Sequence, residues 1–215
     1  MTDRGLVMVV EERVALDREL AILIARDHRG KTSVYPVVET VQIDGICRQV
    51  NLSRAHYRSR TAPAAEFAVA IAELVDLTGI LAVELFETGG QLLINEIATR
   101  PHNSGHYSIE AIATSQFEQH LRAILGLPLG STRLLAKAAS TVNVLGGADG
   151  VDPRDRLPAA LAMTGVSVHL YGKEPRSGRK LGHVTTIGPA ADKCADRAWK
   201  AVELLTQQPR PEGIG

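Results

Sequence analysis

Short aliphatic runs separated by charged and turn-forming positions occupy the first part of the chain. Residues 6–14 and 20–25 are rich in β-branched and aliphatic side chains, so they predict a pair of strands or a strand followed by a crossing strand. Two further runs, residues 33–42 and 46–52, are joined by Asp44-Gly45, a dipeptide that favours a two-residue hairpin turn. Together these runs predict an antiparallel sheet.

A helical period follows, and after it a second pair of strands. Pro63 is expected to open a helix and Gly79 to close it. The apolar stripe of that helix is predicted to comprise Phe67, Ala70, Ile71, Leu74 and Leu77. The runs at residues 80–86 and 91–98, separated by the turn-forming letters ETGG, predict a β-hairpin.

The remaining pattern predicts one more helix and then a strand-rich region. The helix is expected over residues 108–125 and is expected to stop at Gly126. Its inward side chains are predicted to be Ile109, Ile112, Ala113, Leu121 and Ile124. Short strands are expected at residues 140–145, 165–172 and 183–188, with a closing helix over residues 190–205. The fold class is α+β, with a first domain over residues 1–136 and a small β-rich C-terminal domain over residues 137–215.

Composition narrows the class of protein. With 215 residues and 45% hydrophobic side chains, the chain can bury a core. Lys plus Arg equals Asp plus Glu, 24 against 24, so no overall field attracts nucleic acid or an acidic membrane. Cys47 and Cys194 are far apart and form no disulfide framework. Without a signal peptide or a run of ~20 apolar residues, the chain is expected to be soluble and cytoplasmic.

Two carboxylates interrupt the aliphatic runs of the predicted hairpin, Glu84 and Glu96. They either face solvent, which is the simpler reading, or bind a cation such as Mg2+. Both positions are even, so the side chains share a face only if the loop has an odd length, such as residues 88–90. That register places Glu84 opposite Ile94 and Glu96 opposite Ala82, with the carboxylates roughly 7 Å apart. A four-residue loop without a bulge would separate them.

Six polar side chains crowd the segment INEIATRPHNSGH, residues 94–106, directly after the second strand of the hairpin. They are Asn95, Arg100, His102, Asn103, Ser104 and His106. Helix capping explains one or two of them but not six. A zinc pair formed by His102 and His106 is disfavoured, because Pro101 and Gly105 disrupt a helical turn. The segment is therefore interpreted as a ligand-binding loop carried by the sheet.

A second candidate lies in the loop GKEPRSGRKLGH, residues 172–183. Its basic residues are Lys173, Arg176, Arg179 and Lys180. Two readings are balanced here: an ordinary solvated loop, or a cradle for a phosphate monoester in which arginine binds two oxygens at once. With a cation and a polar pocket, the second reading suggests an ATP-driven reaction on a small phosphorylated molecule.

Several runs of the chain resemble one known family, the 5-(carboxyamino)imidazole ribonucleotide synthases, which are ATP-grasp enzymes. The similar runs are VEERVALDRELAILIARDHRGKTSVYPVVE, VEL, INE, RPHNSGH, TSQFEQHLRAILGLPLG, VNVLG and HLYGKEPRSGRKLGHVT. The pairing of RPHNSGH with GKEPRSGRKLGH is specific to that family. Thr99 and Ser177 stand where proline is expected, and neither substitution removes a chemical group. The resemblance implies the C-terminal part of an ATP-grasp fold, an antiparallel sheet with helices.

The resemblance also implies roles for individual residues. Glu11, Glu12 and Val14 would belong to the hinge strand that holds adenine, Glu19 would bind ribose, and Asn95 would also contact the nucleotide. Glu84 and Glu96 would bind Mg2+. The residues implied at the bicarbonate and aminoimidazole ribonucleotide site are Arg100, His102, Asn103 and Ser104, the first three as catalytic groups. Lys173 and Arg179 would bind the phosphate of the substrate, and Lys180 is also expected to bind the substrate.

The implied reaction transfers the ATP γ-phosphate to bicarbonate and passes the carboxyl group from carboxyphosphate to the exocyclic amine of aminoimidazole ribonucleotide. A homodimer and transfer of the product to a separate mutase are also implied. The resemblance covers only about the second half of the family's chain, without the domain whose lysines and glycine-rich loop clamp ATP. Two alternatives therefore stay open: a non-catalytic fragment or binding module that needs a partner chain, and a different ATP-grasp ligase, which would have no reason for Lys173 and Arg179.

Overall fold

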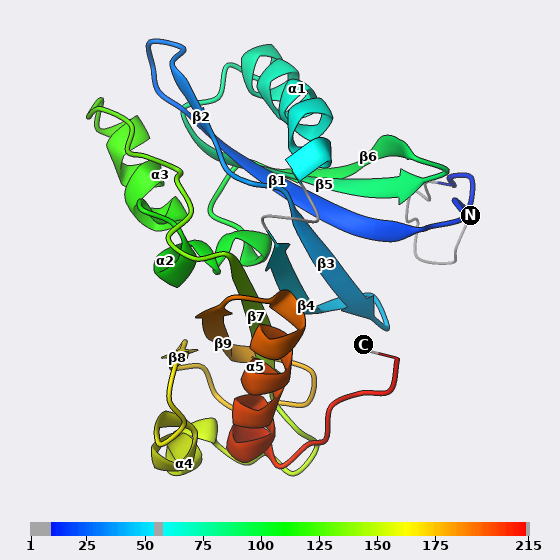
Figure 1. The fold of residues 1–215 in the computed structure, drawn as a ribbon, viewed down its shortest axis with the longest axis vertical. Helices are drawn as coiled ribbons and strands as arrows, with labels where there is room; N and C mark the ends of the chain where they lie inside the picture. Colours follow the sequence, from blue (N-terminus) through cyan, green and yellow to red (C-terminus); the bar gives the residue numbers. More distant parts are fainter. Residues whose placement is uncertain (1–9, 54–57, 214–215) are drawn as a thin grey trace, which may run out of the picture.

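The computed structural model describes residues 10–53 and 58–213. One nine-stranded antiparallel sheet runs through the described chain in the order β6-β5-β1-β3-β4-β7-β9-β8, with β2 paired to β1 outside that path (Figure 1). The strands are β1 (Arg18–Arg26), β2 (Thr32–Val34), β3 (Val38–Ile43), β4 (Ile46–Ser53), β5 (Gly79–Thr88), β6 (Gln91–Ala98), β7 (Ala138–Leu145), β8 (Val166–Leu170) and β9 (Lys180–Gly188). The predicted antiparallel sheet is confirmed.

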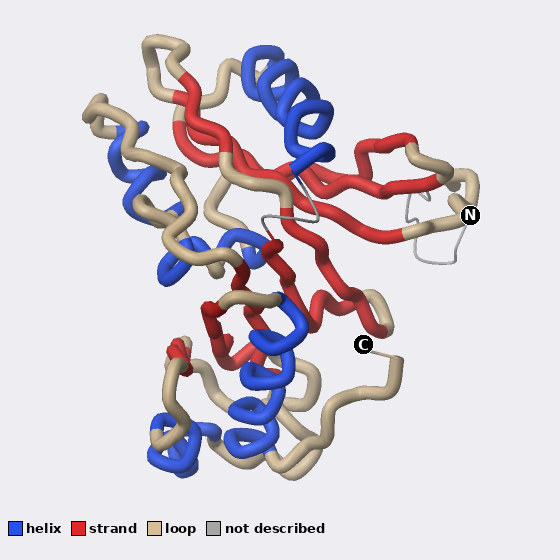
Figure 2. Tube along the Cα trace, in the orientation of Figure 1, coloured by secondary structure: helices blue, strands red, loops and turns tan. Residues whose placement is uncertain are grey.

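Helices cover both faces of this sheet. They are α1 (Arg58–Leu74), α2 (Ser108–Ala111), α3 (Gln116–Ile124), α4 (Leu157–Leu161) and α5 (Ala191–Thr206), with short 3-10 helices η1 (Asn103–Gly105) and η2 (Pro153–Arg156). In Figure 2, α1 lies on one side of β1 and β5, while α2 and α3 lie on the other. The β1 run is almost continuously apolar because it is buried on both faces.

Alternation along β1 assigns each side chain to one of these two faces. Leu20 and Ile22 pack with α1, whereas Ala21 and Leu23 pack with the segment around α2. Glu19 precedes Ala21 by two positions and so belongs to the second face. The candidate functional residues of β1 and β5 therefore face η1 and α2, away from α1.

The first strand begins later than predicted. Residues 10–16 form no strand, and residues 6–9 lie outside the described part of the chain, so the predicted strand at residues 6–14 is wrong where it can be compared. The Asp44-Gly45 turn is confirmed: Ile43 pairs with Ile46, and both turn residues have positive φ, 51° and 72°. This backbone twist is the one that suits a two-residue hairpin.

The helix α1 differs from its prediction at both ends and in its buried stripe. It begins at Arg58, before Pro63, and ends at Leu74, whereas Gly79 opens β5. The most buried side chains are Ala64, Ala68 and Ala72. Leu74 was predicted to face inward and is 86% exposed. Small side chains at every fourth position let the helix approach the sheet closely, so alanine rather than the larger residues defines the stripe.

The helix predicted over residues 108–125 is interrupted. After α2 the chain becomes extended at Ile112, which bridges to Leu134, and Ser115 then caps α3 by accepting a hydrogen bond from the Glu118 amide. The break rotates α3, leaving Leu121 54% and Ile124 48% exposed. The buried side chains of α3 are Gln116, Gln119 and Ala123.

The C-terminal strands and the closing helix are confirmed as β7, β8, β9 and α5, which share a core around Trp199. The sheet is continuous from β4 to β7. The division into residues 1–136 and 137–215 stays a prediction. Among the described residues, no helix has the length and apolar character needed to cross a membrane.

Candidate metal and nucleotide site

The hairpin of β5 and β6 places Glu84 directly opposite Glu96. Its loop has two residues, Gly89 and Gly90, both with positive φ, so the predicted odd loop is wrong. A regular two-residue hairpin would set Glu84 opposite Asn95 and turn Glu96 to the other face. The register instead shifts between Leu85 and Glu84, so that Asn95 is an extra residue in β6. This β-bulge restores a shared face for the two carboxylates.

His102 joins the two glutamates. Ligand atoms of Glu84, Glu96 and His102 all lie within 4.8 Å of one another, and His102 Nε2 is 3.7 Å from Glu84 Oε1. Burial raises the pKa of Glu84, and the neighbouring charges of Glu96 and Glu19 raise it further. Two converging carboxylates with an imidazole fit a divalent cation, because a cation removes their mutual repulsion.

The ring of His102 is held from the opposite side. Its Nδ1 lies 2.9 Å from Ser104 Oγ and accepts a hydrogen bond from the Ser104 amide at 3.3 Å. Burial lowers the pKa of His102, which favours a neutral ring. Asn103 Nδ2 is buried beside the Cys47 thiol, and no oxygen atom of the described residues accepts a hydrogen bond from it. A buried amide donor without an oxygen acceptor suits a site that receives a polar ligand.

A pocket of about 430 Å³, the carboxylate pocket, contains these groups. Its lining residues are Glu19, Gln42, Gly45, Cys47, Glu84, Phe86, Asn95, Glu96, His102, Asn103 and Lys180. They come from β1, β3, the β3–β4 turn, β4, β5, β6, the 94–106 segment and β9. The pocket therefore brings together Glu19, both hairpin glutamates, part of the polar loop and one residue of the basic loop.

Four lining residues were missed by the sequence interpretation: Gln42, Gly45, Cys47 and Phe86. Phe86 could have been found from strand alternation, because it is two positions after Glu84. Gln42 and Cys47 face each other across β3 and β4, and a Gln42 hydrogen bond opposes the rise that burial causes in the pKa of Glu19. Burial raises the pKa of Cys47 to about 11, so its thiol stays protonated at neutral pH.

Other predicted residues lie outside this lining. Arg100 is exposed and donates to the Pro101 carbonyl at 3.2 Å. Lys173 Nζ lies 5.2 Å from the Tyr171 ring centroid, and Arg179 donates to the Glu174 carbonyl at 3.2 Å. Ser104 is buried and contacts His102.

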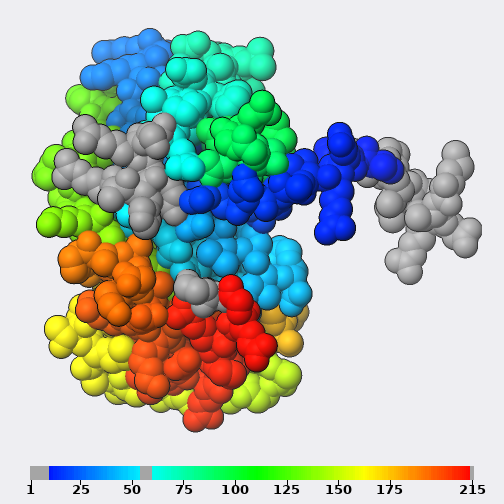
Figure 3. Space-filling model, turned by 45° about the vertical axis from the view of Figure 1, so that its right-hand side comes forward, coloured from blue at the N-terminus to red at the C-terminus, as the bar shows by residue number. Residues whose placement is uncertain are grey.

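The segment before β1 forms a second pocket against β5. A pocket of about 710 Å³ is lined by residues 11–16 together with Phe86, which also lines the carboxylate pocket. Thr88 Oγ1 donates to the Ala15 carbonyl at 2.6 Å, and the Gly89 amide donates to Asp17 at 2.8 Å. Figure 3 shows the first described residues extending from the main body. Phe86 thus separates the predicted adenine segment from the predicted cation ligands.

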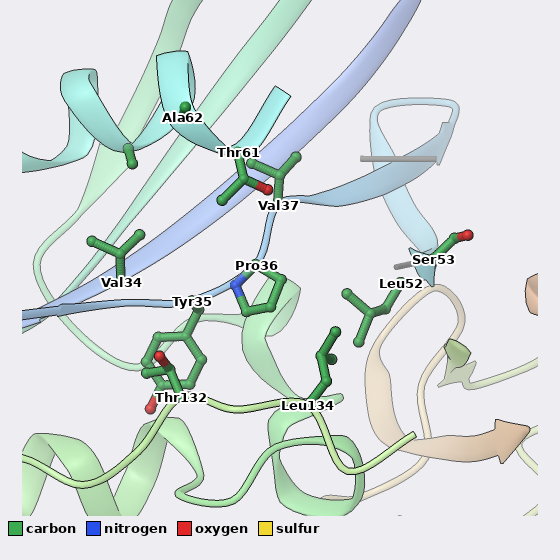
Figure 4. A pocket seen from close by; sticks show the side chains of 11 residues that line it. Val34, Tyr35, Pro36, Val37, Leu52, Ser53, Thr61, Ala62, Thr132 and Leu134 are labelled. Carbon is green, nitrogen blue, oxygen red and sulfur yellow. The ribbon is translucent and has the colours of Figure 1, made fainter. Parts of the chain in front are cut away.

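A third pocket, of about 490 Å³, lies near the start of α1 and is mainly apolar (Figure 4). Its lining residues are Val34, Tyr35, Pro36, Val37, Leu52, Ser53, Thr61, Ala62, Ala65, Thr132 and Leu134. The Tyr35 hydroxyl points away into a hydrogen bond with the Thr114 carbonyl at 3.0 Å. This lining contains no carboxylate or imidazole, so it offers no ligand atoms for a metal ion.

A row of rings continues from the polar loop into the C-terminal strands. The His183 ring stacks between His106 and His169, with both centroid distances 4.6 Å, and His183 Nδ1 lies 2.7 Å from the Tyr171 hydroxyl. Burial lowers the pKa of His106 to about 4 and that of His183 to about 2. A hydrogen bond that His169 Nε2 donates to the Glu110 carboxylate raises the pKa of His169. The row joins the 94–106 segment to β8 and β9.

Known proteins match this chain in both sequence and fold. Residues 1–117 match the ATP-grasp domain, and residues 139–197 match the phosphoribosylaminoimidazole carboxylase C-terminal domain. N5-carboxyaminoimidazole ribonucleotide synthase of Mycobacterium tuberculosis is 44% identical over 207 residues, which is 94% of this chain and 48% of that protein. The Vibrio vulnificus synthase is 40% identical, covering 95% of this chain and 52% of its own length.

Solved structures agree. The synthetase from Thermus thermophilus superposes with a TM-score of 0.81 at 36% identity, over 93% of this chain and 54% of that one. The Aspergillus clavatus synthase, solved with ADP and 5-aminoimidazole ribonucleotide, gives 0.80 at 33% identity, over 90% and 52%. The chain spans about half the length of these relatives. The resemblance inferred from RPHNSGH and GKEPRSGRKLGH is confirmed, and the chain belongs to the ATP-grasp family.

Proposed function

We propose that this chain provides the cation-binding and substrate-binding part of an enzyme that carboxylates 5-aminoimidazole ribonucleotide with bicarbonate and ATP, giving N5-carboxyaminoimidazole ribonucleotide for purine biosynthesis. The observation that supports it best is the bulged hairpin, which sets Glu84 and Glu96 face to face beside His102. Relatives that match this chain over about half of their own length are named as that synthase.

Glu84 and Glu96 would hold Mg2+, and a bound Mg2+ offsets the negative charge of reacting phosphates. Residues Glu11, Glu12 and Val14 would contact adenine on one side of Phe86. Glu19 and Asn95 would contact the rest of the nucleotide on the other side. Phe86 lines both pockets, which supports one extended ligand lying across them.

The second substrate would lie towards the polar loop. His102 and Asn103 line the carboxylate pocket, and Asn103 Nδ2, which has no oxygen acceptor among the described residues, would donate to a carboxylate or phosphate oxygen. Arg100 and Ser104 flank them, the first as an exposed cation and the second as a partner of the His102 ring. Lys180 would bind anionic oxygen inside the pocket, while Lys173 and Arg179 would meet the ribonucleotide phosphate at its mouth.

The chemistry proceeds in two displacements. A bicarbonate oxygen attacks the γ-phosphorus, and ADP leaves with formation of carboxyphosphate. The exocyclic amine then attacks the carboxyl carbon, inorganic phosphate leaves, and the nitrogen loses one proton. The side chains of this chain orient both reactants and keep their charged oxygens paired, which is how most of the barrier to phosphoryl transfer is lowered. A homodimer and delivery of the product to a separate mutase complete the proposal.

The test is calorimetric titration of the chain with ADP in the presence and absence of Mg2+. Glu84→Gln and Glu96→Gln should each weaken the Mg2+-dependent affinity at least tenfold, about 1.4 kcal/mol. Glu73→Gln, an exposed glutamate on α1, is the matched control and should leave the affinity unchanged. Equal affinity with and without Mg2+, or no effect of either hairpin variant, would contradict the proposal.

A second candidate follows from the chain's spanning about half of its relatives' length. A chain that binds nucleotide with Mg2+ but releases no phosphate with bicarbonate and aminoimidazole ribonucleotide would be a binding module that acts with a partner chain. Phosphate release that depends on both substrates would support the complete reaction.

A further inference from the structure

Gln116, the first residue of α3, makes hydrogen bonds to both sides of one backbone unit in the polar loop. Its side chain is 0% exposed. Gln116 Oε1 accepts from the His102 amide at 2.8 Å, and Gln116 Nε2 donates to the His102 carbonyl at 2.8 Å. We propose that Gln116 is the positioning residue that holds His102 at the Glu84–Glu96 pair, an inference that rests on the proposed function.

These contacts fix the orientation of the amide. An oxygen must face the His102 N–H and a nitrogen must face the His102 carbonyl, so the amide cannot be reversed without losing both bonds. The second hydrogen on Nε2 then points to His106 Nδ1 at 3.1 Å. Since an amide nitrogen only donates, His106 Nδ1 must accept and the proton of the neutral ring lies on Nε2. The tautomer of His106 is therefore set by Gln116.

The polar loop is shaped to admit this side chain. A Cβ on Gly105 would lie 2.5 Å from Gln116 Oε1 and 2.4 Å from Leu23 Cδ2, so any other residue at position 105 would collide with the amide. The Gln116 backbone is anchored as well, because its N–H donates to Ser108 Oγ at 2.9 Å. The helix itself is tied to β5, since His120 Nδ1 accepts from the Ile80 amide at 3.2 Å.

This anchoring carries through to the cation ligands. The backbone of His102 is held by Gln116, and its Nδ1 is held by Ser104, so Nε2 is left facing Glu84. Glu84 lies on β5, the strand to which α3 is tied. Gln116 thus closes a loop of contacts that fixes the third side of the cation site without touching the cation.

The chain contains a matched control in the same helix. Gln119 is also 0% exposed, accepts from the Gly130 amide through Oε1 at 2.7 Å, and donates to the Gly130 carbonyl through Nε2 at 2.9 Å. It makes the same two bonds to one backbone unit, but it holds the 126–131 loop instead of His102. Losing either amide should cost similar stability, whereas only Gln116 should affect the site.

The experiment uses the chain with isotope-labelled histidine and compares wild type, Gln116→Met and Gln119→Met by NMR, with and without Mn2+. In wild type and Gln119→Met, Mn2+ should broaden the His102 ring signals, and His106 should carry its proton on Nε2. In Gln116→Met, Mn2+ should bind about tenfold more weakly, with reduced broadening of His102 and loss of the single His106 tautomer. Gln116→Glu keeps an acceptor for the His102 amide and places a carboxylate oxygen beside His106 Nδ1, so in the folded variant His106 should carry its proton on Nδ1.

Two results would overturn the inference. One is a folded Gln116→Met or Gln116→Glu protein with His102 broadening and His106 tautomer unchanged from wild type. The other, independent of how any variant folds, is a wild-type His106 protonated on Nδ1. Failure of wild type to bind Mn2+ would contradict the proposed function instead, and the tautomer, which needs no metal, would still decide the role of Gln116.

Discussion

Glu84 and Glu96 face each other across β5 and β6 only because Asn95 is an extra residue in β6. The bulge converts an even hairpin loop, which would have separated the two carboxylates, into a register that unites them. The bulge also destabilises the free protein, because it brings two carboxylates together with no cation to offset their repulsion. A position arranged for a ligand rather than for stability should gain stability when its charge is removed.

Glu84→Gln should therefore stabilise the metal-free protein at neutral pH. Burial and the charge of Glu96 raise the pKa of Glu84 in the folded state, so the unfolded state loses this proton first as pH rises. The penalty is absent below the unfolded pKa, grows as pH rises towards the folded pKa, and persists above it. The gain in unfolding free energy should be about 0.2–1 kcal/mol near pH 7, the range for charges facing across strands.

Urea unfolding at pH 7 and at pH 3.5 measures this difference. The stabilisation should vanish at pH 3.5, and saturating Mg2+ should reverse it at pH 7, because the cation then stabilises wild type alone. A Glu84→Gln protein less stable than metal-free wild type at pH 7 would show that the carboxylate is part of a stabilising ion pair.

The ring row of His106, His183 and His169 should make the protein acid-sensitive. Burial holds the pKa of His106 at about 4 and of His183 at about 2, whereas both are near 6.5 in the unfolded chain. Stability should fall as pH drops below 6.5, by up to about 1.4 kcal/mol per pH unit for each ring that stays neutral. His169 acts oppositely, because Glu110 raises its pKa.

His183→Phe keeps a ring in the row and removes one of these groups. The slope of unfolding free energy against pH between 6 and 4.5 should be shallower in the variant, whatever its stability at pH 7. Equal slopes would mean that His183 takes up a proton without unfolding.

The sequence interpretation found the sheet, the hairpin and most pocket residues because each depends on local information. Strand alternation and turn residues predicted β3, β4, β5 and β6, and the density of polar residues after β6 indicated the ligand loop. The bulge at Asn95 could not be predicted, because a two-residue and a three-residue loop are equally compatible with ETGG. The conclusion that the carboxylates share a face held for a different reason from the one expected.

Errors in the helices have a common physical origin. Leu121 and Ile124 satisfy an inward helical period, yet the extended residue Ile112 breaks the helix and rotates α3 so that both are exposed. The residues that turn inward instead are Gln116 and Gln119, which periodicity scores as polar surface. Their burial depends on backbone partners in distant loops, a tertiary property that a hydrophobic pattern does not contain.

Lys180 should contribute to the binding of phosphorylated ligands in the carboxylate pocket. Of the basic residues predicted to bind the substrate in the 172–183 loop, it is the one that lines this pocket, where its charge lowers the pKa of Glu84. Lys180→Met should weaken Mg2+-dependent ADP binding about tenfold, about 1.4 kcal/mol. Lys193→Met, on the exposed side of α5, should have no effect in the same titration. Equal affinities of Lys180→Met and wild type would place Lys180 outside the nucleotide site.

Gly105→Ala should destabilise the fold and disturb the site together. The added methyl would lie 2.4 Å from Leu23 Cδ2 and 2.5 Å from Gln116 Oε1, closer than packed atoms approach, so the loop or the amide must move. Overpacking of this kind costs about 1–3 kcal/mol of unfolding free energy.

Gly188→Ala is a control with a milder steric clash, because its methyl would meet Cys194 Sγ at 3.1 Å. Gly188 ends β9 at the opposite end from Lys180, which lines the carboxylate pocket. Thermal unfolding and Mn2+ titration of both variants separate the two effects: Gly105→Ala should lose stability and Mn2+ affinity, whereas Gly188→Ala should lose stability alone. A Gly105→Ala protein that binds Mn2+ like wild type would show that the carboxylate site tolerates movement of the polar loop.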